Sequence, residues 1–477
     1  MEYKPTIGLE IHIELKTDSK MFCSCKNDPD EKRANFNICP ICTAQPGVLP
    51  VINKEAVRKT IKTGLALNCN IAEISKFDRK SYFYPDLPKG YQISQYDKPF
   101  CKQGFLGINN KKIRITRVHL EEDTGRLIHE KDSSLVDFNR AGIPLMEMVT
   151  EPDLTSSKEA RGFAQELKLI LKYLGVSYAD MEKGQLRVEV NISLSKDKKM
   201  GTKVEIKNLN SFKIVEQAID YEIERQAELL DEGKKIIQET RGWDEKKGIT
   251  VSQREKEEAH DYRYLPEPDL PTLHLDKKFV QDIQGEIPEL PQAKRIRLAY
   301  EYKLDENVIK IFTSNKDLGE YFEKVMSELS NWLKEADYQK LVKLAVNYIT
   351  TDFWSLFGKA SIEELESRIT PENFAELIKM IYKQEISSRI AKQVLKEMFE
   401  TKADPSHIIK EKGLTQLTDT GEIEDIIKQI ISKNQKAVED YKKGKENALQ
   451  FLAGQVMAAT RGRAKPDIVQ QLLKKMI

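Results

Sequence analysis

The chain has 477 residues, with 77 Lys and Arg against 76 Asp and Glu and a formal net charge of +1. This length predicts two or three domains, and the balanced charge excludes a surface that is basic throughout, so any polyanion site has to be a local patch. No apolar run approaches the roughly 18 residues of a membrane span, and the N-terminus carries no signal peptide, so a cytoplasmic protein is expected.

The first predicted element is a strand over residues 7–15, in which apolar and polar residues alternate strictly. A period of two places Glu10, His12 and Glu14 on one face and aliphatic side chains on the other. A half-buried strand with one solvated face has the same pattern without any function. The strand by itself therefore indicates only a possible ligand face.

Four of the six cysteines follow within 20 residues: Cys23, Cys25, Cys39 and Cys42. Two close pairs with this spacing suit a structural zinc site with four thiolate ligands, whereas disulfides are unusual in a reducing cytoplasm. Four free thiols in a loop are the alternative. We favour zinc because exposed free thiols are a liability.

Residues 76–96 mix basic and aromatic side chains, among them Arg79, Tyr82 and Lys89. Cations next to rings that can stack suit a single-stranded RNA end. Aromatic packing under a proline-stiffened loop explains the pattern equally well. The sequence leaves both interpretations open.

Glu147 is surrounded by apolar residues, and the acidic run of Glu121, Glu122 and Asp123 follows His119. A lone buried carboxylate costs several kcal/mol, by a rough estimate, unless it is paired or binds a metal. A self-repelling acidic cluster rich in oxygen ligands suits Mg²⁺. A catalytic zinc is disfavoured because the chain has no pair of histidines four residues apart.

Two further strands, over 186–194 and 203–207, and two helices, after Ser156 and over 213–233, complete the predicted first domain. In the strands the ionisable residues again share one face: Arg187, Glu189, Lys203, Glu205 and Lys207. Ser156 with Glu159 forms a capping box, and Gly175 stands where that helix ends. Strands, loops and helices in this mixture predict an α+β fold.

Beyond residue 290, Pro and Gly become sparse and helical periodicity prevails, as in Ile386, Ile390, Val394 and Met398. A break at 401–406 precedes a basic tail, in which residues 431–477 carry ten Lys or Arg and four Asp or Glu. We predict a first domain over 1–290, a helical domain over 291–403 and a tail domain over 404–477. Solvated helix faces are the ordinary explanation of the basic excess, and RNA binding is the other.

Nearly the whole chain resembles the B-subunit family of the glutamyl-tRNA(Gln)/aspartyl-tRNA(Asn) amidotransferases. The motifs that carry this resemblance occur in the family's order at 8–12, 82–86, 119–123, 136–153, 207–212 and 261–264. The resemblance implies a catalytic cradle similar to glutamine synthetase and the guanidino kinases, followed by an all-α domain and a small helical tail. It also implies that ATP phosphorylates the carboxylate of a misacylated tRNA, which ammonia then converts to the amide.

By resemblance, the catalytic residues are Glu10, His12, Glu122, Glu147 and Glu189. The first four of these are expected to bind Mg²⁺, while Arg187, Lys203 and Lys207 contact the nucleotide phosphates. Relatives usually carry Asp where this chain has Glu189. The chain has no P-loop and no kinase glycine-rich loop, so an ATP site has to be built on the sheet.

The resemblance also implies RNA contacts and partner proteins. The tRNA-binding residues expected from it are Arg79, Tyr82, Lys89, Lys442, Lys443, Arg461 and Arg463. No glutaminase or amidase motif is present, so ammonia is expected from the amidase of the family, its A-subunit, with the small C-subunit completing a heterotrimer. The alternatives are a non-catalytic zinc-containing RNA-binding protein and the archaeal counterpart specific for glutamyl-tRNA(Gln), which carries an inserted domain for which this chain is too short.

Overall fold

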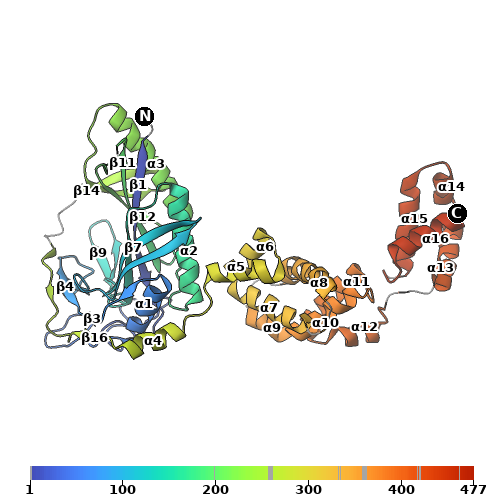
Figure 1. The fold of residues 1–477 in the computed structure, drawn as a ribbon, viewed down its shortest axis with the longest axis horizontal. Coiled ribbons are helices and arrows are strands. Elements are labelled where there is room, and N and C mark those ends of the chain that lie inside the picture. Colours follow the sequence, from blue (N-terminus) through green and yellow to red (C-terminus); the bar gives the residue numbers. More distant parts are fainter. Residues whose placement is uncertain are drawn as a thin grey trace. The chain divides into compact units, whose positions relative to one another are not determined.

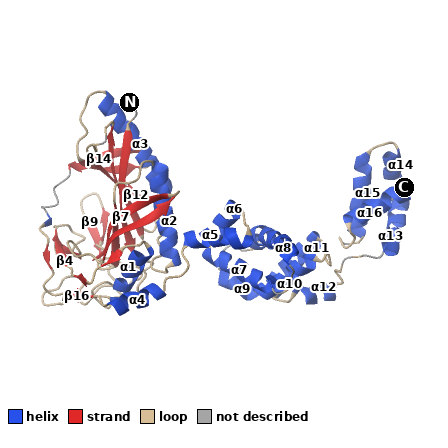
Figure 2. Ribbon diagram, in the orientation of Figure 1, coloured by secondary structure: helices blue, strands red, loops and turns tan. Residues whose placement is uncertain are grey.

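The structure is a computed structural model, and it describes residues 3–477 apart from 198, 256–261, 331, 333–334, 357–361, 416, 418–419 and 461. The chain forms two compact units, Met1–Pro291 and Gln292–Ile477. Strands and helices mix in the first unit, and the second is built from helices in the part that is described (Figures 1 and 2). The α+β expectation is confirmed at this level.

A nine-stranded sheet forms the centre of the first unit, in the order β14-β13-β12-β11-β1-β10-β7-β6-β2. Its strands are β1 (Lys4–Glu14), β2 (Asn70–Ile71), β6 (Cys101–Ile108), β7 (Lys111–Glu122), β10 (Pro144–Thr150), β11 (Leu186–Ser195), β12 (Val204–Leu209), β13 (Glu239–Asp244) and β14 (Ile249–Glu255). Neighbouring strands are antiparallel except β12 and β13, which are parallel. The three strands predicted from alternation all lie in this sheet, and β1 is central.

Three small sheets accompany the large one. They are β15 (Leu265–Pro266) with β4 (Asp78–Ser81) and β5 (Tyr91–Ser94), β16 (Leu273–His274) with β3 (Ile74–Ser75), and β8 (Arg126–His129) with β9 (Ser134–Asp137). The first of them carries the aromatic and basic segment 76–96. Strand β5 also contacts β7 of the large sheet.

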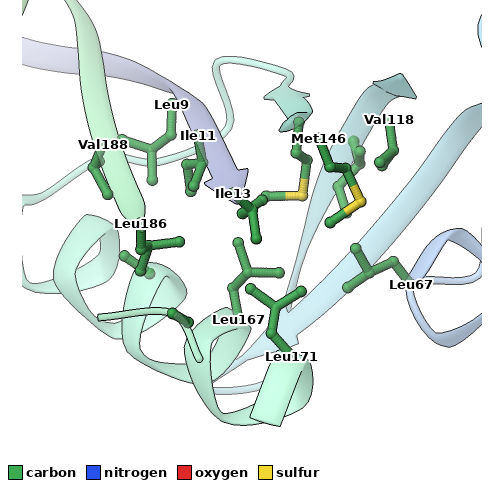
Figure 3. Close-up of a cluster of buried hydrophobic side chains, with 14 of the residues drawn as sticks. Leu9, Ile11, Ile13, Leu67, Val118, Met146, Leu167, Leu171, Leu186 and Val188 are labelled. Carbon is green, nitrogen blue, oxygen red and sulfur yellow. The ribbon is translucent and has the colours of Figure 1, made fainter. Parts of the chain in front are cut away.

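One face of the large sheet is apolar and packs on helices (Figure 3). The helices of this unit are α1 (Lys54–Ala66), α2 (Ser157–Tyr173), α3 (Phe212–Asp231) and α4 (Lys277–Gly285). Leu9, Ile11 and Ile13 of β1 are at most 1% exposed. They share one core with the fully buried Leu167 and Leu171 of α2. The apolar half of the alternation in β1 therefore stabilises the fold.

Both long helices of this unit are capped, and the residues predicted to cap α2 lie at its ends. Ser156 accepts a hydrogen bond from the Glu159 backbone N–H at 3.2 Å, and Gly175 has a φ of +66° after the last turn of α2. The Glu159 carboxylate accepts from the Thr155 backbone N–H at 2.8 Å instead of that of Ser156, so the reciprocal bond of the capping box is shifted by one residue. Helix α3 is capped by Ser211.

The second unit contains the helices α5 (Pro291–Tyr302), α6 (Glu306–Ser314), α7 (Lys316–Ser330), α8 (Glu335–Tyr348), α9 (Ile362–Arg368), α10 (Pro371–Tyr382), α11 (Ser388–Thr401), α12 (Pro405–Lys412), α13 (Thr420–Lys433), α14 (Gln435–Lys442), α15 (Glu446–Ala459) and α16 (Pro466–Met476). A π-helical turn, Ile349–Phe353, follows α8. The periodic residues Ile390, Val394 and Met398 are buried in α11, as predicted, whereas Ile386 is buried ahead of this helix, which begins at Ser388.

Two hydrophobic clusters lie in this unit, and α12 belongs to the first of them. Its Ile408 and Ile409 pack in the cluster that contains Phe322, whereas the second cluster forms around residues such as Ile423 and Leu452. The packing therefore changes after α12 and not at the break at 401–406. The division into three domains stays a prediction. No helix in the described part of the chain is long and apolar enough to cross a bilayer.

Candidate functional site

The polar face of the large sheet brings together side chains from four neighbouring strands. Across β7, β10, β1 and β11, the register pairs His119 with Glu147, Glu147 with His12, and His12 with Arg187. Since residues paired across strands point to the same face, these four side chains form one row. Segments far apart in the sequence thus meet on one surface.

A second row lies one step along the strands. Glu10 of β1 is paired with Glu189 of β11, and the Lys207 Nζ lies 2.7 Å from Glu189 Oε2. Glu10, Glu189 and Glu205 can bring ligand atoms within 4.8 Å of one another. Burial, together with the charges of Glu147 and Glu189, raises the pKa of Glu10 to about 7. The negative charge in this row exceeds what Lys207 neutralises.

Glu147 occupies the middle of the first row and is 4% exposed. Its carboxylate lies 3.4 Å from His12 Nε2, 3.5 Å from His119 Nε2 and 3.6 Å from Arg117 Nη2. Burial favours the neutral carboxyl, but the imidazoles of His119 and His12 hold the pKa of Glu147 well below its usual value. The partner that the buried carboxylate needs is therefore a set of three basic side chains.

His12 lies between several carboxylates. Its Nε2 is 3.9 Å from both Glu10 Oε1 and Glu121 Oε1, in addition to its contact with Glu147. Burial lowers the pKa of His12, but the hydrogen bond to Glu147 and the charges of Glu147 and Glu121 outweigh it and raise the pKa to about 9. Without a metal, a protonated His12 partly neutralises this acidic surface.

The donor set fits a hard divalent cation. Among the described residues, two groups bring their ligand atoms within 4.8 Å of one another. The first consists of Glu10, His12 and Glu147, and the second of His119, Glu121 and Glu147. Carboxylate oxygens dominate both groups, which suits Mg²⁺ better than zinc. A Mg²⁺ ion usually keeps waters and shares substrate phosphates, so a few carboxylates from the protein are sufficient to hold it.

The structure does not bring Glu122 into this group. The side chain of Glu122 points away from the polar face. Its Oε1 lies 2.6 Å from Lys89 Nζ and accepts a 3.0 Å hydrogen bond from the Ile93 backbone N–H. Glu121 occupies the position that was expected for Glu122, because His119 and Glu121 alternate with Val118 and Leu120 along β7 and so point to the polar face. The expectation that Glu122 joins Glu10, His12 and Glu147 is therefore corrected by the direction of its side chain.

The sequence indicated His119 and Glu121 only through the acidic run, without assigning them as ligands, and it did not indicate Arg117 or Lys80. The alternation of His119 and Glu121 with apolar neighbours could have identified the first two. Lys80 is different, because it comes from β4 of a small sheet, and its place is set by tertiary packing. Although burial opposes it, the charge of Glu121 raises the pKa of Lys80 above its ordinary value, so it stays cationic.

The predicted phosphate-contact residues separate. Arg187 Nη2 donates to Asp123 Oδ2 at 2.9 Å, and Lys207 pairs with Glu189 as described above. Lys203 is exposed and immediately precedes β12. Lys203 and Lys207 lie on the same side of that strand by alternation. Their contact with phosphate stays a prediction.

The residues expected to meet RNA in the first unit are occupied by internal contacts. Arg79 forms two 2.8 Å hydrogen bonds with the buried Glu267, and its guanidinium lies 4.4 Å from the centre of the Tyr91 ring. Lys89 pairs with Glu122, and Tyr82 packs edge-on against Tyr262. Their role in RNA binding stays a prediction.

In the tail, Lys442 and Lys443 are exposed at the end of α14. Arg463 is half-buried, and its Nε donates to the Thr460 carbonyl at 3.3 Å. Arg461 lies outside the described residues. Two of the four predicted basic residues are thus free to meet solvent or a polyanion.

The four clustered cysteines converge. Cys23, Cys25, Cys39 and Cys42 can place their sulfur atoms within 4.8 Å of one another. A hydrogen bond from Cys23 and the charge of Lys20 lower the pKa of Cys42 to about 5, whereas burial raises that of Cys25 to about 11. Four sulfurs at this spacing fit a tetrahedral zinc ion.

Comparisons with known proteins agree with one another. Residues 5–281 match the family described as the GatB/GatE catalytic domain, and residues 320–477 match the GatB domain. The B subunit of the aspartyl/glutamyl-tRNA(Asn/Gln) amidotransferase of Thermotoga maritima is 47% identical, over 100% of this chain and 99% of its own length. The B subunits of the same enzyme from Caldicellulosiruptor saccharolyticus and Persephonella marina are 49% and 48% identical over the whole of this chain, which covers 99% and 100% of their lengths.

Proposed function

Because this chain belongs to the family of tRNA-dependent amidotransferase B subunits, we propose that it activates the carboxylate of misacylated Glu-tRNA(Gln), Asp-tRNA(Asn) or both with ATP. The activated carboxylate is then converted to the amide by ammonia. The protein is in this sense the ligase part of an amidotransferase. A non-catalytic RNA-binding protein is not favoured, because it would have no need for the buried carboxylates of the polar face.

The single observation that carries the proposal is the row of His119, Glu147, His12 and Arg187 with Glu121 and Glu10 beside it. A carboxylate resists ammonia because oxide would have to leave, and phosphorylation supplies a better leaving group. Phosphoryl transfer depends mainly on positioning and on neutralising charge. An acidic face with basic side chains at its edge can do both.

We assign the individual roles as follows. Glu10, His12, Glu121 and Glu147 would hold Mg²⁺, which supplies charge neutralisation for the transferred phosphoryl group. Lys203 and Lys207 at β12, with Arg187, donate to the phosphates from one side. Arg117 and Lys80 place cationic groups on the opposite side of Glu147 and orient the carboxylate that accepts the phosphoryl group. In this assignment Glu189 positions Lys207 through their 2.7 Å contact.

The cradle similar to glutamine synthetase and the guanidino kinases remains part of the proposal. It is supported by a largely antiparallel sheet with carboxylates on one face and a helix-covered apolar face on the other. Such a sheet provides an ATP site without a glycine-rich loop. In the same way, we propose a structural Zn²⁺ held by the four cysteines.

We further propose that ammonia reaches this chain from an amidase A-subunit, that a small C-subunit joins both in a heterotrimer, and that the complex works in the cytoplasm. The tail would bind the body of the tRNA through exposed residues such as Lys442 and Lys443. Replacing both by Glu should weaken tRNA binding and reduce its salt dependence, because fewer counterions would be released from the phosphates. An unchanged dissociation constant and salt slope would argue against this role.

Reconstitution tests the main proposal. The purified chain, combined with its amidase and small partners, should convert Glu-tRNA(Gln) or Asp-tRNA(Asn) to the amide with ATP, Mg²⁺ and glutamine. Each misacylated tRNA is supplied separately, which also identifies the substrate. Amidation that proceeds equally well without ATP would refute carboxylate activation, and amide formation from glutamine by this chain alone would refute an external source of ammonia.

A further inference from the structure

Lys20 is a lysine whose side chain is completely buried. It is 0% exposed and is among the largest fully buried side chains of the chain. A buried ammonium group loses its hydration and therefore needs an anion or several hydrogen-bond acceptors nearby. Lys20 was not singled out by its sequence context, because it stands between two ordinary loop residues before the first cysteine pair.

The contacts of Lys20 contain a thiol and no carboxylate. Its Nζ donates to Cys42 Sγ at 3.8 Å and to the Phe138 carbonyl at 3.2 Å. In the part of the chain that the structure describes, no Asp or Glu forms an ion pair with it. The only group of these two that can carry negative charge is the sulfur of Cys42.

The knuckle formed by residues 19–45 is also joined to the segment 136–142 by direct hydrogen bonds. Asn35 and Asn139 each accept from the backbone of the other segment, with Phe138 N–H donating to Asn35 Oδ1 at 2.7 Å and Phe36 N–H to Asn139 Oδ1 at 2.8 Å. At the other end, the Met21 N–H donates to the Gly142 carbonyl at 2.7 Å. The Asn35 N–H also donates to Asp137 Oδ1 at 2.9 Å, and Lys20, next to Met21, adds an ammonium group to these attachments.

The segment 136–142 leads directly into β10, which carries Glu147. Gly142 also donates its N–H to the Asp123 carbonyl at 2.9 Å, at the end of β7 where Glu121 lies. A Cβ at Gly142 would stand 3.6 Å from Cys42 Cβ and 3.6 Å from Lys20 Cδ, and its φ is +85°. The knuckle, Lys20 and the neighbouring ends of β7 and β10 are therefore packed around one glycine.

From these contacts we infer that Lys20 is the internal counter-ion of a metal-bound tetrathiolate and ties that site to the segment 136–142. The inference rests on the zinc proposed above. A Zn²⁺ ion with four thiolate ligands carries two net negative charges, which is the anion that a buried ammonium group requires. The same ammonium group holds the Phe138 carbonyl, so loss of the metal would remove the charge that keeps Lys20 and this segment in place. Lys20 is thus a positioning residue.

Lys20→Met tests the inference, with Lys26→Met as its control. Methionine fills the space of the lysine stem without its charge. Lys26 belongs to the same knuckle, but its ammonium group pairs with Asp28 and its side chain is 70% exposed. Both variants are prepared as full chains in the heterotrimer, and the release of zinc to a chromophoric chelator is followed together with zinc content.

Removing a group that contacts a metal ligand typically costs about 10- to 100-fold in metal affinity. If this loss lies in dissociation, we expect Lys20→Met to release zinc about 10 to 100 times faster than the wild type. Lys26→Met should match the wild type. Equal release rates in the two variants would overturn the role of Lys20 and leave the zinc site intact. If the purified wild-type protein contained no zinc, both the proposed zinc site and the role of Lys20 would be overturned. The amidation assay would still test the proposed activity independently.

A spectroscopic measurement separates charge compensation from packing alone. With Co²⁺ in place of zinc, Lys20→Met should shift the thiolate-to-cobalt charge-transfer absorption to lower energy, because the sulfur that loses the ammonium contact gives up its electrons more easily. An unshifted band would contradict the counter-ion role.

If Lys20→Met fails to fold, hydrogen exchange in the wild type replaces it. Removing zinc with a chelator should then increase exchange at residues 136–142 but not in α2. Unchanged exchange at 136–142 in protein that has lost its zinc would overturn the inference.

Discussion

The two faces of the nine-stranded sheet are made from the same strands but follow opposite physical rules. On the face that packs on α2, Leu9, Ile11 and Ile13 exclude water and stabilise the fold in proportion to the apolar area that they bury (Figure 3). On the other face, Glu10 and His12 from the same strand belong to a surface crowded with ionisable groups. Alternation within one strand thus separates the residues that stabilise the fold from those available for chemistry, so each set can be changed alone.

The largest expected effect is on the polar face, at Glu147. Glu147→Gln keeps the shape of the side chain but removes its charge, and ATP-dependent amidation should fall by about 10²- to 10³-fold or more, the size of losing one preorganised electrostatic contact. Glutaminase turnover by the amidase partner should persist. Glu151→Gln, a nearby change of the same kind outside the row, should stay close to the wild type. Full activity of Glu147→Gln would remove Glu147 from the site.

On the apolar face, Leu167→Ala should lower the free energy of unfolding by about 2 to 5 kcal/mol, because it leaves a cavity where a fully buried side chain stood. Denaturant unfolding measures this loss. The activity per folded molecule should stay near the wild-type value. If amidation fell as far as in Glu147→Gln while the protein stayed folded, the separation of the two faces would be disproved.

The pH dependence of stability provides a third test. The pKa of Glu10 is raised by burial, and by Glu147 and Glu189, from its ordinary 4.5 to about 7 in the folded protein. The unfolded chain therefore releases this proton first, so the stabilising contribution of Glu10 is complete below pH 4.5 and is lost as pH rises to about 7.

In metal-free protein, Glu10→Gln should therefore gain stability relative to the wild type across this range, by at most about 1.4 kcal/mol for each pH unit. Thermal or denaturant unfolding at several pH values in the presence of a chelator measures the difference. Parallel pH profiles for the two proteins would contradict the raised pKa.

The smallest effect is expected at Glu189, which pairs with Lys207. Glu189→Asp shortens the side chain by one methylene and lengthens its 2.7 Å contact with Lys207, but it keeps the charge of the second row. The rate of amidation should change by less than about tenfold, because an ion pair near the surface contributes only up to about 1 kcal/mol. A loss as large as that of Glu147→Gln would mean that Glu189 itself binds the metal.

Much of the first unit could be predicted from local patterns in the sequence. Strict alternation identified β1 and β11 and assigned Glu10, His12 and Glu189 to a polar face, because the period of two in a strand is a local property of the backbone. Capping residues and periodicity likewise determined α2. The spacing of the four cysteines predicted their convergence. The family resemblance supplied the chemistry, which alternation alone could not indicate.

Tertiary structure decided which side chains meet. Alternation with Val118 and Leu120 places His119 and Glu121 on one face of β7. Only the pairing of β7 with β10 shows that this face also carries Glu147, and only tertiary contacts show that Glu122 faces Lys89. Lys80 and Lys20 likewise obtained their places from segments far away in the chain. Strand register and packing join residues that are far apart in the sequence, so local sequence patterns do not predict them and the folded structure is needed.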